Sequence, residues 1–340
     1  MTPPAWTAVA RGMITIALGV VAAGAATADT RTVRGPIESR DEFLLAQSLL
    51  TLPPLAAALT AAGRTTVRVD ADWGNDFGLE ADPGGRRENL RFFVDGEHRT
   101  FALTVRRGLP AGWAVGARIP LHWRGGGWLD TVIDPFHRRF GFPDSGRPRY
   151  PQRRLRVEGR LREGEPFEWM GRAGTGLGSV ELEVGKAIRT GATGGPAIAV
   201  VARTLLPTSS GAFAEAGRGA GAQALLSQPL GRSFDLHAGG GASVLGPATR
   251  DGLAYERNRG FGFVALEWRP TASWSALVQW EASSRLVRSV DGYPGLQLSL
   301  RIGSKVDARR WRLEGGFLEG IKDLDATTDF GVFAALSRRF

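Results

Sequence analysis

The chain contains no cysteine, which excludes a fold held by disulfide bridges and any metal site built on thiolates. Charged residues make up only 23% of its 340 residues and both signs are interspersed, so a disordered polyampholyte is also excluded. Lysine and arginine outnumber aspartate and glutamate by 43 to 34, but the basic residues are scattered rather than gathered into runs. We therefore expect no nucleic-acid partner.

Long hydrophobic runs are missing too, except near the N-terminus. Arg11 is the only charged residue among the first 28, and the apolar run at 13–26 is shorter than the roughly 18 residues that a spanning helix needs. The run leads into an A-x-A cleavage pattern at 26–28. We expect a signal peptide that is cleaved near Ala28, which leaves 312 residues and, without Arg11, lowers the net charge from +9 to +8. The mature chain is then exported.

The exported part alternates apolar and polar residues with the period of a β-strand. At the C-terminus Phe330, Val332, Leu336 and the last residue, Phe340, share one face. A terminal aromatic residue of this kind resembles the assembly signal of outer-membrane barrels. We therefore expect the barrel-assembly machinery and outer-membrane lipid as partners, with Arg338 reaching to the periplasmic interface.

The same alternation recurs along the chain in segments of about 10 residues, the length with which a tilted strand crosses a bilayer. Short links alternate with long polar ones, as in an up-and-down transmembrane barrel whose short turns face the periplasm. An even number of strands places both chain ends on that side. Twelve antiparallel strands are predicted: 65–75, 97–107, 112–124, 177–188, 196–206, 218–229, 233–245, 257–268, 273–284, 295–305, 310–320 and 328–340.

Two further β-like segments leave a fourteen-stranded barrel open. Residues 88–94 face 99–105 across the hairpin signal Asp95-Gly96, and 153–162 also has strand character. A tight turn at 109–112 forces the descending strand to be 97–107. We therefore favour twelve strands, with 88–94 in the first extracellular loop and β-extensions above the membrane.

The longest insertion, 125–176, begins with apolar residues at helical spacing and ends that pattern at Gly141 and Pro143. We expect a short helix there, in a loop that folds over or into the mouth of the barrel. Residues 29–64 contain proline and lack alternation, and they form an N-terminal segment that is either periplasmic or lumenal. The barrel itself is expected to span 65–340.

Several segments resemble an uncharacterised bacterial family, and the similarity is densest between residues 34 and 180. They are Arg34–Asp41, Asp72–Phe77, Val94–Glu97, Arg107–Trp113 and Gly127–Pro143 with Arg147. The sequence is identified by them as a member of the domain-of-unknown-function family 3187, exported proteins taken to be outer-membrane barrels. The resemblance implies compartment and fold, but it brings no substrate and no catalytic residues.

Charged and histidine side chains at inward positions are candidates for lining the lumen. They carry both signs in nearly equal number, which suits either a polar conduit that sorts solutes or a narrow lumen filled by mutual pairing. The candidates are Arg68, Asp70, Asp72, Arg118, His122, Glu181, Glu183, Asp235, His237, Glu281, Arg301, Arg312 and Glu314.

Enzyme signatures are poor, since the sequence has no G-x-S-x-G, no H-E-x-x-H and no P-loop. Asp235, His237 and Ser243 share a strand face, but Asp235 and Ser243 lie roughly 27 Å apart at about 3.4 Å per residue. We expect no catalytic residues, no metal and no cofactor. Candidates for a site at the mouth of the barrel are Trp128, Asp130, Asp134, His137 and Arg147, of which the aspartates and the histidine otherwise cap and solvate the predicted helix.

The sequence thus predicts a bacterial outer-membrane barrel for passive passage or binding of a small solute, with the 125–176 loop constricting its mouth. Two alternatives stay open: a non-conducting barrel with a structural or surface-interaction role, and a membrane-embedded hydrolase.

Overall fold

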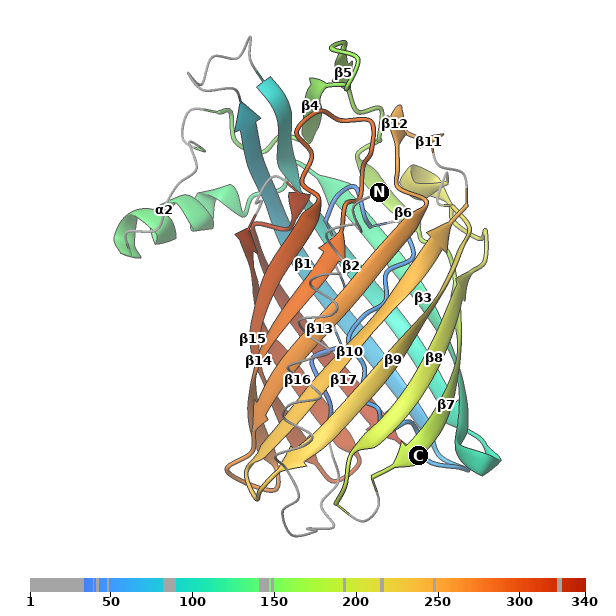
Figure 1. Ribbon diagram of the computed structural model, residues 1–340. Coiled ribbons are helices and arrows are strands. Elements are labelled where there is room, and N and C mark those ends of the chain that lie inside the picture. The colour runs from blue at the N-terminus through green and yellow to red at the C-terminus, as the bar shows by residue number, and fades with distance from the viewer. Residues whose placement is uncertain are drawn as a thin grey trace.

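The computed structural model describes residues 34–340 except 39, 41–42, 48, 82–89, 141–146, 148–149, 192–193, 215–216, 247–248 and 323–325. Twelve long strands form a closed antiparallel barrel (Figure 1). The strands are β1 (Thr65–Ala81), β2 (Leu90–Gly108), β3 (Trp113–Gly125), β7 (Glu181–Thr190), β8 (Ala197–Leu205), β9 (Gly219–Leu230), β10 (Phe234–Leu245), β13 (Asn258–Trp268), β14 (Trp274–Ser284), β15 (Leu296–Ala308), β16 (Trp311–Lys322) and β17 (Phe330–Arg339).

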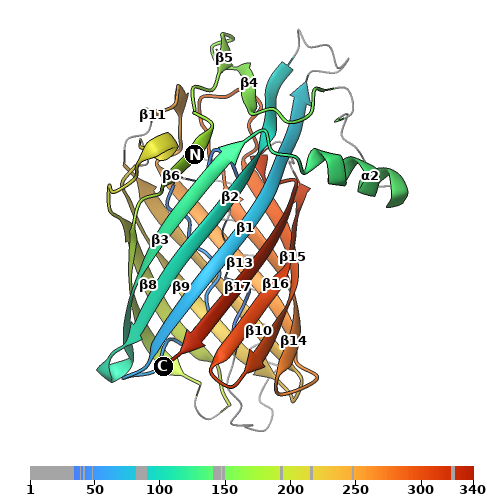
Figure 2. The ribbon, with the colours of Figure 1, turned by 180° about the vertical axis from the view of Figure 1, so that it is seen from behind.

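Each strand pairs with the next one, and the first and last strands close the cylinder. β1 runs against β17 from Thr66↔Arg339 to Asn75↔Phe330, as Figure 2 shows from behind. The predicted twelve-stranded up-and-down barrel is therefore confirmed. Several strand ends shift by a few residues. The predicted strand 177–188 is interrupted: residue 177 belongs to the short β6 (Gly174–Leu177), and β7 starts at Glu181, with both pieces paired to β3.

The first hairpin is longer than predicted, because β2 runs without a break through Asp95 and Gly96. Asp95 pairs with Phe77 of β1, so this dipeptide lies within a strand and forms no turn. Residues 90–94 thus continue β2 beyond the wall instead of forming loop, while 88–89 lie outside the described residues. β4 (Arg156–Arg160) pairs with this extension and β5 (Pro166–Glu168) with β4, so neither adds a spanning strand and the fourteen-stranded alternative is wrong.

The outer wall carries the apolar half of the alternation. Val69, Trp268 and Leu336 are 49%, 45% and 44% exposed, whereas the inward Phe263 and Ala335 are buried. Such a wall suits a lipid environment. Among the described residues, no helix is both long enough and apolar enough to cross a membrane.

Arg338, on the outer face of β17, lies among aromatic rings at the end of the barrel that carries the short turns, here called the turn end. Its guanidinium carbon is 5.1 Å from the ring centroid of Trp311 and 4.6 Å from that of Phe340. Cation–π contact gives this charge a partner at the edge of the apolar belt, where a charged group costs little.

Introducing a charge in the middle of this wall tests the register. Val278 faces outward in β14 between Leu266 and Ile302 of the neighbouring strands. We expect Val278→Arg to cost about 2–4 kcal/mol of unfolding free energy in bilayers, and Val306→Arg, near the turn end, about 0–1 kcal/mol. Urea titration of protein folded in phospholipid vesicles measures both variants; equal costs would contradict the register.

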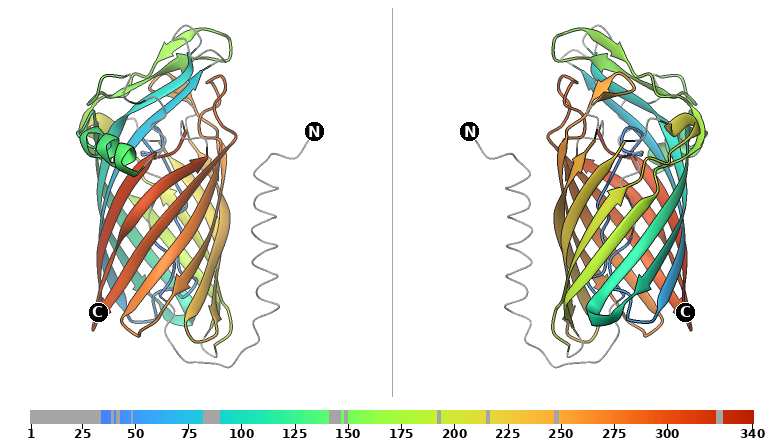
Figure 3. Two further views of the ribbon diagram at one scale, coloured as in Figure 1. Left: turned by 90° about the vertical axis from the view of Figure 1, so that its left-hand side faces the viewer. Right: turned by 90° about the vertical axis from the view of Figure 1, so that its right-hand side faces the viewer.

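The core of the molecule is the barrel interior, which encloses most of the described residues of 34–64, a stretch here called the lumenal segment (Figure 3). The segment enters at the turn end, where Arg34 Nε lies 2.7 Å from Asp307 Oδ2. It reaches the opposite, loop end at Phe43–Leu50 and returns to the turn end, where Ala62 bridges to Gly108 just before β1. Both ends of the segment therefore lie at the same mouth of the barrel.

Candidate functional site

The thirteen predicted lumen-lining residues all lie on the inward side of the strands. Nine are buried, and Asp72, Glu183, Glu281 and Arg312 are half-buried. Their inward placement follows from the strand period, since the residues on either side of them face out. The question is whether they line an open path or pair with one another.

Glu181 is the centre of the first group of ion pairs. Its carboxylate lies 2.6 Å from Arg40 Nη2, 3.1 Å from Arg118 Nη1 and 3.5 Å from Arg203 Nη1. Glu183 lies 2.5 Å from both Arg106 Nε and Arg203 Nη2. One carboxylate thus joins the lumenal segment, through Arg40, to two strands of the wall.

Several other inward charges are paired in the same way. Arg68 lies 2.5 Å from Asp70 and 2.9 Å from Glu314, and Arg301 Nε lies 2.5 Å from Glu281 Oε1. Buried charges are tolerated when paired and hydrogen-bonded. The pairing interpretation therefore describes this conformation better than an open ring of free charges. His122, also inward, makes a 2.8 Å hydrogen bond with Thr100 Oγ1.

Backbone groups of the lumenal segment are satisfied by side chains of the wall. Gln279 accepts a hydrogen bond from Ile37 N at 2.9 Å and donates one to Ile37 O at 3.1 Å. Lys305 Nζ donates to Pro36 O at 2.5 Å, and Arg301 Nη2 donates to Arg40 O at 2.6 Å. Near the loop end Asp76 accepts from Leu44 N at 2.7 Å. Polar contacts spread along the barrel therefore hold the segment, in addition to the hydrophobic clusters that include Ile37, Leu55 and Ala57.

A hydrophobic cluster closes the loop end above the lumenal segment. Residues 43–46, 49 and 50 of the segment supply its base, and residues from several loops and strand ends cover it. These are Phe92, Val94, Val157, Trp169, Leu205, Leu245, Leu253, Tyr255, Leu286, Val287, Val290, Tyr293 and Ala326. The 125–176 insertion thus contributes to the closure through Val157 and Trp169.

The helix predicted in that insertion is present as α2 (Asp130–Phe140), but it does not fold over the mouth. Figures 1 and 2 show it projecting sideways from the barrel. Its base packs on the outward side of β1, where the Trp128 ring meets that of Trp73 at 5.0 Å. Arg147 forms ion pairs with Asp130 and Asp329 there. The insertion was expected at the mouth, where Val157 and Trp169 do lie, but its helix is elsewhere. The spacing of apolar residues predicts a helix and does not determine the surface on which the helix packs.

The other two predicted mouth residues, Asp134 and His137, lie in α2, but their side chains fall outside the described residues. A ligand site on that helix therefore stays a prediction. In the part of the chain that the structure describes, no group of three or more metal-binding side chains is assembled.

His237 has partners that the sequence did not suggest. Its Nδ1 is 2.9 Å from Ser227 Oγ and its Nε2 is 3.1 Å from Glu267 Oε2, whereas Asp235 pairs with Arg269 at 2.9 Å. The order Ser–His–Glu resembles a catalytic triad. However, all three triad side chains are fully buried, and Ser227 Oγ accepts a hydrogen bond from Ala57 N, so an acyl substrate has no access. The grouping of Asp235, His237 and Ser243 is not formed.

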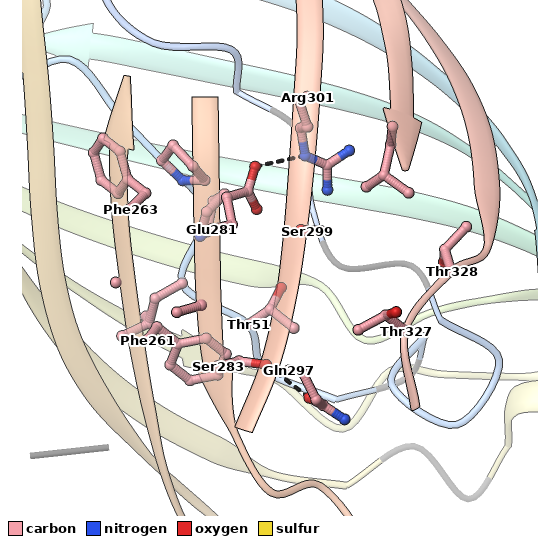
Figure 4. A pocket seen from close by; sticks show the side chains of 16 residues that line it. Thr51, Phe261, Phe263, Glu281, Ser283, Gln297, Ser299, Arg301, Thr327 and Thr328 are labelled. Atoms are coloured by element: carbon pink, nitrogen blue, oxygen red, sulfur yellow. Dashed lines mark hydrogen bonds and ion pairs between the residues drawn. The ribbon is translucent and has the colours of Figure 1, made fainter. Parts of the chain in front are cut away.

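The space left inside the barrel is divided into unequal parts. Near the loop end, cavities of about 40, 10 and 20 Å³ remain between the segment and the wall. Figure 4 shows the first, which is crossed by the Arg301–Glu281 and Ser283–Gln297 contacts. At the turn end one cavity of about 560 Å³ is open. A solute can therefore enter from the turn end, and the lumenal segment and the hydrophobic cluster of the loop end lie beyond this cavity.

One ion pair makes the attachment of the segment depend on pH. Glu38 Oε2 lies 2.6 Å from Arg106 Nη1. Burial alone would raise the pKa of Glu38, but the charges of Arg106 and Arg68 outweigh it and lower the pKa from 4.5 to about 2. Because the folded pKa lies below the unfolded value, this pair stabilises the docked segment above about pH 4.5 and ceases to do so as the pH falls towards 2.

A spin label on Ala56→Cys, a unique thiol in this chain, reports that change. We expect constant label mobility between neutral pH and about pH 5, and increasing mobility below about pH 4.5. In the Glu38→Gln background the contribution of this pair to the pH dependence should disappear. Identical pH curves with and without Glu38 would show that the pair does not hold the segment.

Comparison with known proteins agrees with this architecture. The crystal structure of the COG4313 outer membrane channel from Pseudomonas putida F1 is similar, with a TM-score of 0.56, 12% identity, and coverage of 85% of this chain and 100% of that one. Two looser matches follow. The NanC porin has a TM-score of 0.45 and 9% identity, with coverage of 81% of this chain and 98% of that one. A Pseudomonas aeruginosa FadL homologue has a TM-score of 0.42 and 10% identity, with coverage of 92% of this chain and 99% of that one.

At 12% sequence identity, the similarity to the COG4313 channel is evidence for the fold alone. No curated protein matches the chain in sequence. A family model described as "Protein of unknown function (DUF3187)" matches residues 13–340. The chain therefore belongs to the DUF3187 family, and its fold is a transmembrane β-barrel of the outer-membrane type.

Proposed function

We propose that this protein is an outer-membrane channel for a small solute, and that its lumenal segment is the gate. The observation that carries the proposal is the way the lumen is filled. A twelve-stranded barrel lies between small barrels filled by their own side chains and wide open porins. Here the filling is a separate stretch of chain that is not part of the wall, and many of its attachments are individual hydrogen bonds, such as those from Gln279, Lys305 and Arg301. These hydrogen bonds can be exchanged for water without unfolding the wall, and the apolar contacts of the segment add to the cost of opening.

Location and assembly belong to the same proposal. The signal peptide is cleaved near Ala28, the turn end faces the periplasm, and the strand that ends at Phe340 is read by the barrel-assembly machinery. The apolar outer wall, with Val69 and Leu336 exposed, supports a lipid environment.

A second candidate is a barrel that never conducts. The hydrophobic cluster at the loop end favours it, because apolar side chains such as Leu50 and Tyr293 are fully enclosed there. Single-channel recording on the purified full chain in planar bilayers separates the two. Discrete openings that a solute can block support the channel, and lasting silence under all applied voltages supports the closed barrel.

A further inference from the structure

The cavity at the turn end has the dimensions of a ligand site. Its volume of about 560 Å³ falls within the range of roughly 300–1,000 Å³ that small-molecule pockets occupy. It lies between the returning part of the lumenal segment, at Leu55–Ala61, and inward residues of β1, β3, β7 and β16. We call it the vestibule.

The vestibule is strongly basic. Eight arginines but only three glutamates line it, namely Arg34, Arg64, Arg68, Arg106, Arg309, Arg310, Arg312 and Arg339 with Glu38, Glu183 and Glu314. The glutamates are engaged with Arg68 and Arg106 in the deeper part of the cavity.

Towards the opening the arginines outnumber their partners. Asp307 alone serves three of them, at 2.7 Å from Arg34, 2.7 Å from Arg312 and 3.5 Å from Arg339. Nη1 of Arg34, a buried atom, has no hydrogen-bond partner in the described part of the chain. Positive charge is therefore left over at the mouth of the vestibule.

The hairpin turn between β15 and β16 adds two more cations. Ala308 pairs with Trp311, so Arg309 and Arg310 form a two-residue turn, and neither makes an ion pair within the described residues. Arg309 adopts φ +55°, in the left-handed region that such turns normally fill with glycine or asparagine. Backbone preference therefore does not account for arginine here.

We propose that the vestibule binds a small solute with two or more carboxylate or phosphate groups, from the periplasmic side. Guanidinium groups form paired hydrogen bonds with such anions, and several of them around one cavity favour more than one acidic group per ligand. This deepens the proposed function by naming its substrate class, and it rests on that function for the view that the bound solute is cargo.

The test measures binding to the full-length protein in detergent, with citrate as the polyanionic probe and glucose as the uncharged one. Titration calorimetry at low ionic strength should detect citrate but not glucose, and added salt should weaken the citrate signal. Arg309→Gly/Arg310→Asn removes two charges and gives the turn the residues that its backbone prefers. We expect this variant to fold normally and to bind citrate about tenfold or more weakly.

The matched control also removes two charges at the turn end, but outside the vestibule. Arg107 and Arg232 are exposed there, and neither lines the cavity. Arg107→Gln/Arg232→Asn should bind citrate like the unmodified chain. An absence of citrate binding, or equal weakening in both double variants, would overturn the proposal. Because binding is measured without conduction, a barrel that binds citrate but never conducts would contradict the channel and leave this site standing.

Discussion

Deleting residues 37–58 and joining the ends with a short glycine–serine linker should turn a mostly closed barrel into a steadily open one, with single-channel conductance higher by roughly an order of magnitude. The deletion is geometrically simple, because residues 34 and 62 both lie at the turn end. It removes the base of the hydrophobic cluster and the backbone groups that Gln279 and Arg301 bind. What remains inside is the inner face of the wall, which carries the ion-paired side chains and some apolar ones such as Phe263 and Leu277.

The matched control removes chain from outside the lumen. Replacing residues 131–139 of α2 by a short linker leaves the lumenal segment in place, because this helix projects away from the barrel (Figure 1). We expect its conductance to equal that of the full chain. If the two deletions behave alike, the lumenal segment is not the barrier.

Glu181→Ala should lower the unfolding free energy by about 3–5 kcal/mol, the range for removing one partner of a buried ion pair. The carboxylate is surrounded by Arg40, Arg118 and Arg203, and its loss leaves three buried guanidinium groups with less compensation. Denaturant titration in bilayers measures the change.

Two comparisons show whether charge is the cause. Glu163→Ala, on an exposed loop, should change the unfolding free energy by less than about 0.5 kcal/mol. Combining Glu181→Ala with Arg118→Gln should recover part of the loss, because one unpaired cation is removed. A loss that the second substitution leaves unchanged would mean that packing, and not pairing, explains the role of Glu181.

The wall of the barrel could be predicted from the sequence because its signal is local. In β14 the alternation of Val278 and Trp280 with Gln279 and Glu281 is visible within a few residues, and it fixes which side chains point inward. The same period also placed the candidates for the lumen. It could not say which candidates pair, since His237 takes its partners Ser227 and Glu267 from two neighbouring strands.

The lumenal segment could not be placed in this way. It has no period, and its contacts join residues far apart in the chain: 141 positions separate Arg40 from Glu181, and 242 separate Ile37 from Gln279. The inward-facing glutamines were one sequence signal for a stretch of chain inside the barrel. The amide of Gln279 both donates to and accepts from one backbone residue, and Gln223 donates to Pro53 O, as suits a wall that holds a chain.

The gating role of the lumenal segment is tested most directly by locking it to the wall. Leu50 lies at its loop end, and a Cβ placed on Gly219 of β9 would be 3.2 Å from Leu50 Cβ, so a shift of a few tenths of an ångström reaches the roughly 3.8 Å typical of a disulfide. In this cysteine-free chain, Leu50→Cys/Gly219→Cys provides a single possible bridge. Planar-bilayer recording should show silence when the bridge is oxidised and discrete openings after reduction. Equal currents in both states, or silence in both, would contradict a channel gated by this segment.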